Sequence, residues 1–222
     1  MKVMRMPMNE VMRAGLGMEI IYSFIIILLA LMIYFGTKKI YNLSSHKGIK
    51  YFRLSFLFFA IAYFCRSFIK FIISIFNSGH IWNFAHKLFG LISLALLIYF
   101  STLAIFYLAY SIFWKKANKN FIYYIHIIAA AIAILSLITM NPLFHLVIQV
   151  GLFILIAAVA YLAHKRKTNM YRIYILIFIF WIINVLDILI PNVFRGAQLA
   201  IYLASIAVFA LVTYKVLRKV GV

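Results

Sequence analysis

The stretch Leu88–Trp114 reads LFGLISLALLIYFSTLAIFYLAYSIFW, 27 residues without one charged side chain. About 20 apolar residues are enough to cross the hydrocarbon core of a bilayer. Large apolar side chains occur all around this helix rather than along one stripe, which is typical of a membrane span and not of an amphipathic surface helix. Lys87 precedes the run, and Lys115 and Lys116 follow it. The stretch therefore predicts a transmembrane helix with a basic end.

The whole chain has the same character. Of its 222 residues, 68% are hydrophobic and 11% are charged, whereas soluble domains are about 45–50% apolar and about 25% charged. This composition excludes a soluble globular domain. Six further runs have the length of a span: Glu19–Phe35, Leu54–Phe76, Phe121–Met140, Leu143–His164, Ile173–Ile190 and Ala197–Leu217. We expect an all-α, polytopic integral membrane protein with seven transmembrane helices in a single domain over residues 18–222, and a multi-pass location in the cell membrane. Residues 1–17 are expected to be either a short exposed tail or an over-extended start, and in the second case Met18 is the true start.

The cations indicate the orientation. Fifteen of the 22 Lys and Arg residues follow the first, third, fifth and seventh runs, and five lie at the other ends of the runs. Short cytoplasmic loops carry an excess of Lys and Arg. The N-terminus is therefore expected outside and the C-terminus in the cytoplasm, where the basic loops would meet anionic lipid headgroups. Because the cations lie in short loops between apolar runs, no nucleic-acid partner is expected.

Ionisable residues inside the predicted spans are the most informative, because such groups are costly in a membrane unless they are paired or wetted. Arg66 is expected near the middle of the second span. Lys70 lies one helical turn further out and Tyr63 one turn deeper, all three on one face. On the sixth span, Asp187 is expected at a depth similar to Lys70, with Asn184 one turn deeper on the same face.

Two interpretations of these residues remain open. In the first, Asp187 forms an ion pair with Lys70 or Arg66 and fixes how the second and sixth spans pack. In the second, Arg66, Lys70, Asp187, Asn184 and Tyr63 line an outward-facing polar cavity, to which Glu19 and Tyr22 contribute from the outer end of the first span. The two cations would favour an anionic ligand such as a carboxylate, a phosphate or a lipid headgroup, since Arg binds planar and tetrahedral anions in bidentate fashion.

The histidines do not make a convincing metal site. His80, His86 and His145 share the predicted outer edge, but no paired spacing such as HExxH exists. No metal and no cofactor is expected, haem included. His126 is expected to be a packed histidine bonded to a tyrosine across helices.

The sequence does not define a reaction. No two carboxylates are placed to share acid–base work, and phosphate-binding and nucleophile motifs are absent, so an enzyme is disfavoured but not excluded. The preferred function is a small-ligand membrane protein of receptor, sensor or transporter type with an outward-facing cationic cavity. The alternative is a non-catalytic membrane subunit or scaffold that packs against a membrane protein partner.

Overall fold

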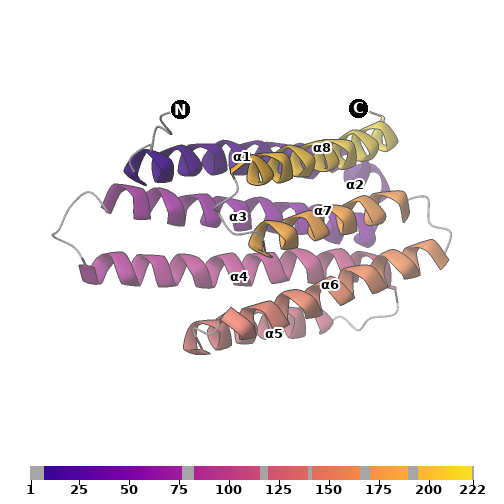
Figure 1. The fold of residues 1–222 in the computed structure, drawn as a ribbon. Helices are drawn as coiled ribbons and strands as arrows, with labels where there is room; N and C mark the ends of the chain where they lie inside the picture. Colours follow the sequence, from indigo (N-terminus) through magenta and orange to yellow (C-terminus); the bar gives the residue numbers. More distant parts are fainter. Residues whose placement is uncertain are drawn as a thin grey trace.

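The structure, a computed structural model, describes residues 8–76, 83–115, 120–139, 142–165, 171–189 and 195–221. Within these ranges, the side chains of residues 8–16, 69–70, 72–76, 83–90, 142–146, 149, 185, 187–189 and 195 are outside the description. The described residues form eight α-helices and no strand (Figure 1). The helices are α1 (Met8–Gly36), α2 (Lys38–Ser44), α3 (Lys47–Phe76), α4 (Asn83–Phe113), α5 (Phe121–Thr139), α6 (Pro142–Lys165), α7 (Tyr171–Leu189) and α8 (Arg195–Val220).

Among the described residues, five helical segments are long and apolar enough to cross a membrane: Gly17–Ser44, Lys47–Phe68, Leu91–Phe113, Phe121–Thr139 and Gly196–Val220. The described parts of α6 and α7 add two shorter apolar helices, Val150–Lys165 and Tyr171–Asn184. The expected all-helical fold is thus confirmed, with several helices compatible with a multi-pass membrane protein.

In the described part of the chain, each of the seven long helices overlaps one of the seven predicted runs. Helices α3 and α4 begin at Lys47 and Asn83, before the predicted starts at Leu54 and Leu88, and two further differences lie near the N-terminus. Helix α1 begins at Met8 and not at Glu19, so part of the expected tail is helical. The reason is that Met, Glu, Arg and Ala, which are strong helix formers, precede the apolar run. The short helix α2 was not predicted. It follows a turn at Thr37, and Ser45 caps its C-terminal end. Ser45 has a left-handed backbone (φ 50°) and donates its N–H to the Tyr41 carbonyl oxygen (2.8 Å).

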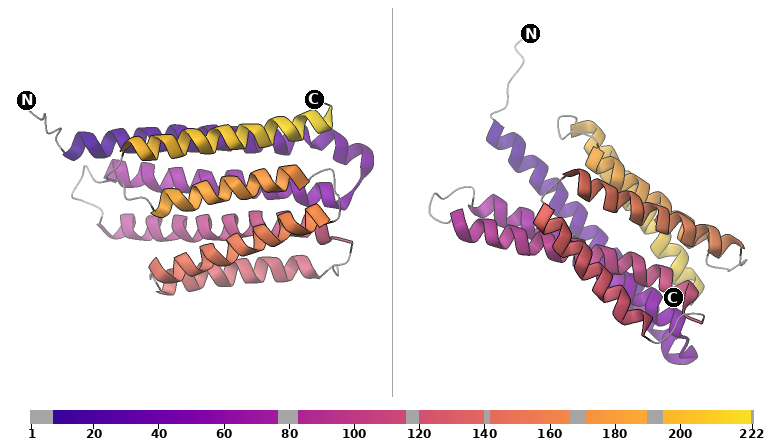
Figure 2. Two further views of the ribbon diagram at one scale, coloured as in Figure 1. Left: turned by 45° about the vertical axis from the view of Figure 1, so that its right-hand side comes forward. Right: turned by 90° about the horizontal axis from the view of Figure 1, so that it is seen from below.

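Six long helices close a ring. Contacts link α1 to α3, α3 to α4, α4 to α6, α6 to α7, α7 to α8, and α8 back to α1. Helix α5 packs outside this ring, mainly on α4. Figures 1 and 2 show the arrangement from the side, with α1 beside α8 at one edge, α3 and α7 next, then α4 and α6, and α5 at the far edge.

The middle of the ring is filled by aromatic side chains. Phe209 of α8 lies 5.3 Å from Phe59 of α3, 4.8 Å from Phe180 of α7 and 6.1 Å from Phe56 of α3 between ring centroids. We call these four residues the aromatic layer. Phe180 and Phe209 are each 1% exposed, so the layer joins α3, α7 and α8 through a fully buried contact.

The two ends of the bundle differ in charge. The basic end, as used below, is the end where α1, α4, α6 and α8 terminate and where α2 and the C-terminus lie (Figure 1). There the buried Arg53 of α3 donates from Nε to the Tyr34 carbonyl oxygen (3.0 Å), and its guanidinium lies 4.7 Å from the Tyr34 ring. A cation that satisfies a carbonyl in the last turn of a helix stabilises that end. Arg53 therefore fixes the end of α1 against the start of α3.

Candidate functional site

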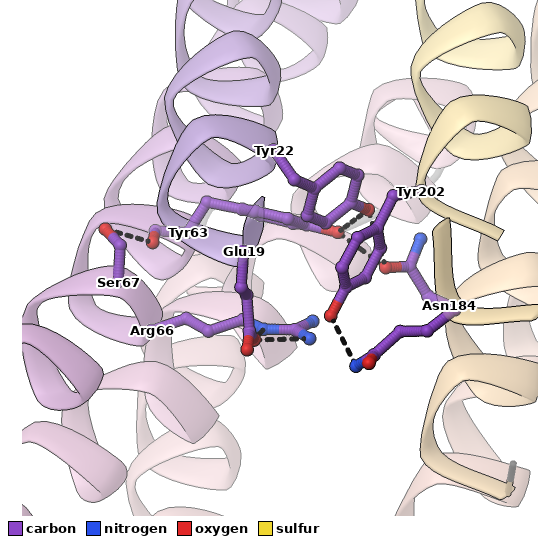
Figure 3. A network of polar contacts seen from close by, with 8 residues as sticks. Glu19, Tyr22, Tyr63, Arg66, Ser67, Asn184 and Tyr202 are labelled. Atoms are coloured by element: carbon purple, nitrogen blue, oxygen red, sulfur yellow. Dashed lines mark hydrogen bonds and ion pairs between the residues drawn. The ribbon is translucent and has the colours of Figure 1, made fainter. Parts of the chain in front are cut away.

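An ion pair joins α1 and α3 in the half of the bundle away from the basic end. Arg66 donates from Nε to Glu19 Oε1 at 3.0 Å, and Arg66 Nη2 lies 3.0 Å from the same oxygen (Figure 3). The Glu19 side chain is 6% exposed and that of Arg66 is 21% exposed. A carboxylate at this level of burial requires a charged or hydrogen-bonded partner, and Arg66 supplies both the charge and the hydrogen bond.

A cluster of hydroxyl and amide groups lies one helical turn deeper. Tyr22 follows Glu19 by three residues and Tyr63 precedes Arg66 by three, so each pair shares one helix face. The Tyr22 and Tyr63 hydroxyls are 3.1 Å apart. Both hydroxyls also donate to Asn184 Oδ1 of α7, at 3.2 Å from Tyr22 and 2.6 Å from Tyr63 (Figure 3).

The hydroxyls of Tyr22 and Tyr63 and the Oδ1 of Asn184 make three contacts with one another, but only two hydroxyl protons are available for them. Tyr22 and Tyr63 carry one hydroxyl proton each, so only two of the three contacts among Tyr22, Tyr63 and Asn184 hold a hydrogen bond at one time. Asn184 is held in place independently, because its Nδ2 donates to the Phe180 carbonyl oxygen at 2.8 Å. The cluster can therefore redistribute its protons without a movement of its heavy atoms.

Helix α8 completes the arrangement. The Tyr202 ring stacks on the Tyr22 ring, with centroids 4.6 Å apart and an interplanar angle of 13°. Gln198, one turn earlier on α8, donates from Nε2 to the Tyr202 hydroxyl at 2.9 Å. We call the set that spans α1, α3, α7 and α8 the polar network: Glu19, Tyr22, Tyr63, Arg66, Asn184, Gln198 and Tyr202.

Four of the predicted ligand-binding residues lie together in this network: Glu19, Tyr63, Arg66 and Asn184. Glu19, expected at the outer boundary of the first span, is the acid that contacts Arg66. The side chains of Lys70 and Asp187 are outside the described residues, so a pair between Asp187 and Lys70 or Arg66 stays a prediction.

Sequence reasoning missed the contribution of α8. Gln198 and Tyr202 have the i, i+4 spacing of one helix face, and they lie in the N-terminal half of α8, away from Lys215, Arg218 and Lys219. That spacing was the available signal, but a Gln and a Tyr near a span end are also typical of an ordinary membrane interface.

The expectation for His126 is confirmed. Its Nδ1 lies 2.8 Å from the Tyr99 hydroxyl and its Nε2 lies 2.8 Å from the Tyr107 hydroxyl. Both tyrosines belong to α4 and His126 belongs to α5, so the imidazole bridges the two helices. The side chains of His80, His86 and His145, the weighed metal ligands, are outside the described residues.

Comparison with known proteins finds an archaeal relative. No protein-family model matches the chain, and no solved structure matches it. A protein of Archaeoglobus fulgidus named "Uncharacterized protein" is 34% identical over 217 residues, which cover 90% of this chain and 92% of the relative. The similarity extends over nearly the whole of both chains and not over a single helix. The chain therefore belongs to the same family as this archaeal protein.

Proposed function

We propose that the chain is a small-ligand membrane protein of receptor, sensor or transporter type, with the polar network as its ligand site. In this proposal α1 and α3 to α8 cross the membrane, the N-terminus is outside and the C-terminus is cytoplasmic. The excess of cations at the basic end supports this orientation. The polar network then lies toward the outer face.

The Glu19–Arg66 pair is the observation that carries the proposal. Arg66 belongs to the apolar segment Lys47–Phe68 of α3 and Glu19 to the apolar segment of α1. Ionisable groups at such positions are rare and in general mark sites for substrates, ions or protons. A pair that only fixed helix packing would not need the hydroxyl and amide groups of Tyr22, Tyr63 and Asn184 one turn deeper.

The ligand is expected to carry an anionic group. Arg66 is the more exposed member of the pair, and its planar guanidinium suits carboxylate and phosphate oxygens. An anion that approaches Arg66 competes with Glu19 for the guanidinium. Tyr22, Tyr63 and Asn184 would then provide donors and acceptors for the polar part of the ligand.

A thermal-unfolding panel tests the proposal on the full chain in detergent. Soluble carboxylates and phosphates are titrated against the parent, Arg66→Gln, and a control variant Arg172→Gln, which removes an exposed Arg at the start of α7. We expect a saturable rise in melting temperature for the parent and for the control, and no rise for Arg66→Gln.

Arg66→Gln alone leaves the Glu19 carboxylate without its ion-pair partner and could fail to fold for that reason, so a double variant is tested beside it. Glu19→Gln with Arg66→Gln removes both charges and leaves neither unpaired, so it should fold, and it should not respond to the anions. If no compound in the panel stabilises the parent, or if the double variant responds as the parent does, the ligand proposal is wrong. The chain would then fit the alternative of a membrane subunit that packs against a partner.

Uptake measurements separate a transporter from a sensor. A ligand in the polar network meets the aromatic layer before it reaches the basic end, so transport requires Phe59 and Phe209 to separate. Proteoliposomes loaded with the stabilising compound would exchange it with the medium if the chain transports it. Binding without exchange indicates a sensor or receptor.

A further inference from the structure

A cavity lies at the basic end, away from the polar network. Its volume is about 390 Å³, which is within the range of about 300–1,000 Å³ that is common for small-molecule sites. The lining comes from α2, α3, α4, α7 and α8, and from residues just before and after α2. The residues that decide its chemistry are His46, Phe52, Ser111, Trp114, Lys115 and Lys219.

The charge of this cavity is positive. Lys115 follows the end of α4 and Lys219 lies in the last turn of α8, and both side chains are exposed. No Asp or Glu is among the described lining residues. The chain has three acids. Of these, Glu19 precedes Thr37 at the cavity by 18 positions, or about 27 Å at the rise of a helix. The two ammonium groups are therefore not neutralised by a nearby described carboxylate.

The wall beside these lysines is apolar with a few polar groups. Trp114 and Phe52 form part of it, and Lys115 Nζ lies 5.7 Å from the Trp114 ring centroid. The Ser111 and Tyr174 hydroxyls, which also line the cavity, are hydrogen-bonded to each other at 3.0 Å. The cavity thus presents positive charge and hydroxyl groups next to an extended hydrophobic surface.

Gly48 lets the start of α3 approach this wall. A Cβ atom at Gly48 would lie 2.8 Å from Trp114 Nε1 and 2.9 Å from the Ser111 carbonyl oxygen. Those distances are shorter than side-chain contacts in real proteins, so only glycine fits here without a shift of its neighbours. The close approach places the first turn of α3, with its partial positive charge, at the cavity.

We propose that this cavity binds an acidic amphiphile, an anionic headgroup joined to an apolar chain. Lys115 and Lys219 attract the headgroup, and Trp114 and Phe52 pack against the apolar part. An anionic membrane phospholipid has this chemistry. The cavity shares no residue with the polar network. The test of this proposal is therefore independent of the test of the proposed ligand site.

Three probes test both halves of the proposal on the purified full chain. Phosphatidylglycerol carries the anionic headgroup and the apolar chains, glycerol 3-phosphate carries the charge alone, and phosphatidylcholine carries the chains with a zwitterionic headgroup. We expect a saturable rise in melting temperature with phosphatidylglycerol only. An equal effect of glycerol 3-phosphate would contradict the role of the apolar wall, and an equal effect of phosphatidylcholine would contradict the role of the lysines.

Matched variants locate the effect. Lys115→Gln with Lys219→Gln should weaken the apparent affinity for phosphatidylglycerol at least tenfold. The control, Lys39→Gln with Lys165→Gln, removes two exposed cations from the same end that do not line the cavity, and it should change the affinity less than twofold. Equal weakening by both pairs would show general attraction to a basic surface and overturn the proposal.

A third variant keeps all charges and fills the space. Ile40 of α2 lines the cavity and is partly exposed, so Ile40→Trp adds bulk to the wall without a change in the bundle core. We expect at least a tenfold loss of phosphatidylglycerol affinity with an unchanged melting temperature of the lipid-free protein. Parent-like affinity in Ile40→Trp would show that the lipid binds elsewhere.

Discussion

Glu19 and Arg66 neutralise each other in a part of the bundle where neither charge is well hydrated. The carboxylate depends on the guanidinium more than the reverse, because Glu19 is the more buried of the two. The removal of one partner should therefore be more damaging than the removal of both.

Glu19→Gln is expected to lower the free energy of unfolding by about 3 kcal/mol, the low end of the range for broken buried pairs, because Arg66 is partly exposed. Glu19→Gln with Arg66→Gln should recover most of this loss. Reversible unfolding in mixed detergent measures both. A single variant as stable as the parent would show that the pair is solvated and contributes little.

Asp187→Asn is expected to destabilise the chain in the same assay if Asp187 pairs with Lys70 or Arg66, as its place on α7 predicts. Lys70→Gln should then cost a similar amount, and the double variant should cost less than the sum. Additive effects of the two substitutions would contradict a direct Asp187–Lys70 pair.

At the scale of elements, α5 is attached to the ring from outside, and His126 is the polar part of that attachment. Both ring nitrogens contact tyrosine hydroxyls of α4. Ala129 and Ala133 lie further along the same helix and are 0% and 5% exposed, so small side chains let α5 approach closely. Polar and close-packed contacts therefore follow one face of α5.

A double-mutant cycle between His126→Leu and Tyr107→Phe should give a coupling energy of about 1 kcal/mol, typical of interhelical hydrogen bonds in membranes. The control cycle pairs His126→Leu with Tyr123→Phe, at an exposed tyrosine of α5. Its coupling energy should be near zero. Equal coupling in both cycles would show that the His126 effect is not carried by the hydrogen bond.

The long helices could be predicted from the sequence because their signal is local. Runs such as Phe121–Met140 are apolar throughout, and the structure ends α5 within one residue of that prediction. Helix α2 could not be predicted, because Lys38 and Lys39 follow an apolar run and are equally typical of a loop. Its formation depends on the left-handed backbone at Ser45, which no pattern in the sequence requires.

The candidate site was predicted in part for a related reason. Helix periodicity places Tyr63 and Arg66 on one face of α3, and Asn184 on the same face of α7 as Asp187, without any knowledge of packing. The choice of Glu19 as the partner of Arg66 depends on how α1 lies against α3. Periodicity gives the face of each helix but not the relative depth of two helices, so the acid of α7 was preferred.

At the scale of the whole molecule, the aromatic layer separates the polar network from the basic-end cavity. On α3 the order along the helix is Phe52 at the cavity, Phe56 and Phe59 in the layer, and Tyr63 in the network. Helix α8 passes in the opposite direction through Tyr202, Phe209 and Lys219. The polar network and the basic-end cavity therefore lie along one internal axis, on opposite sides of the aromatic layer.

Phe209→Ala should lower the free energy of unfolding by about 3–5 kcal/mol, because it leaves a void among three other rings. The Phe35 side chain is 61% exposed. Phe35→Ala should therefore change the free energy of unfolding by only about 0.5 kcal/mol, as ordinary surface substitutions do. Unfolding in mixed detergent compares the two. A similar cost for both would show that the layer is not tightly packed.

In the proposed topology the polar network lies toward the outside and the basic end toward the cytoplasm. Cysteine labelling of intact cells with a membrane-impermeant thiol reagent measures this topology. The variants carry Cys65→Ala and one new cysteine, either Asn192→Cys, between α7 and α8, or Lys165→Cys, at the end of α6. We expect the cysteine at position 192 to react from outside. The cysteine at position 165 should react only after the cells are permeabilised. Labelling of the Lys165 position in intact cells, with protection at Asn192, would contradict this topology.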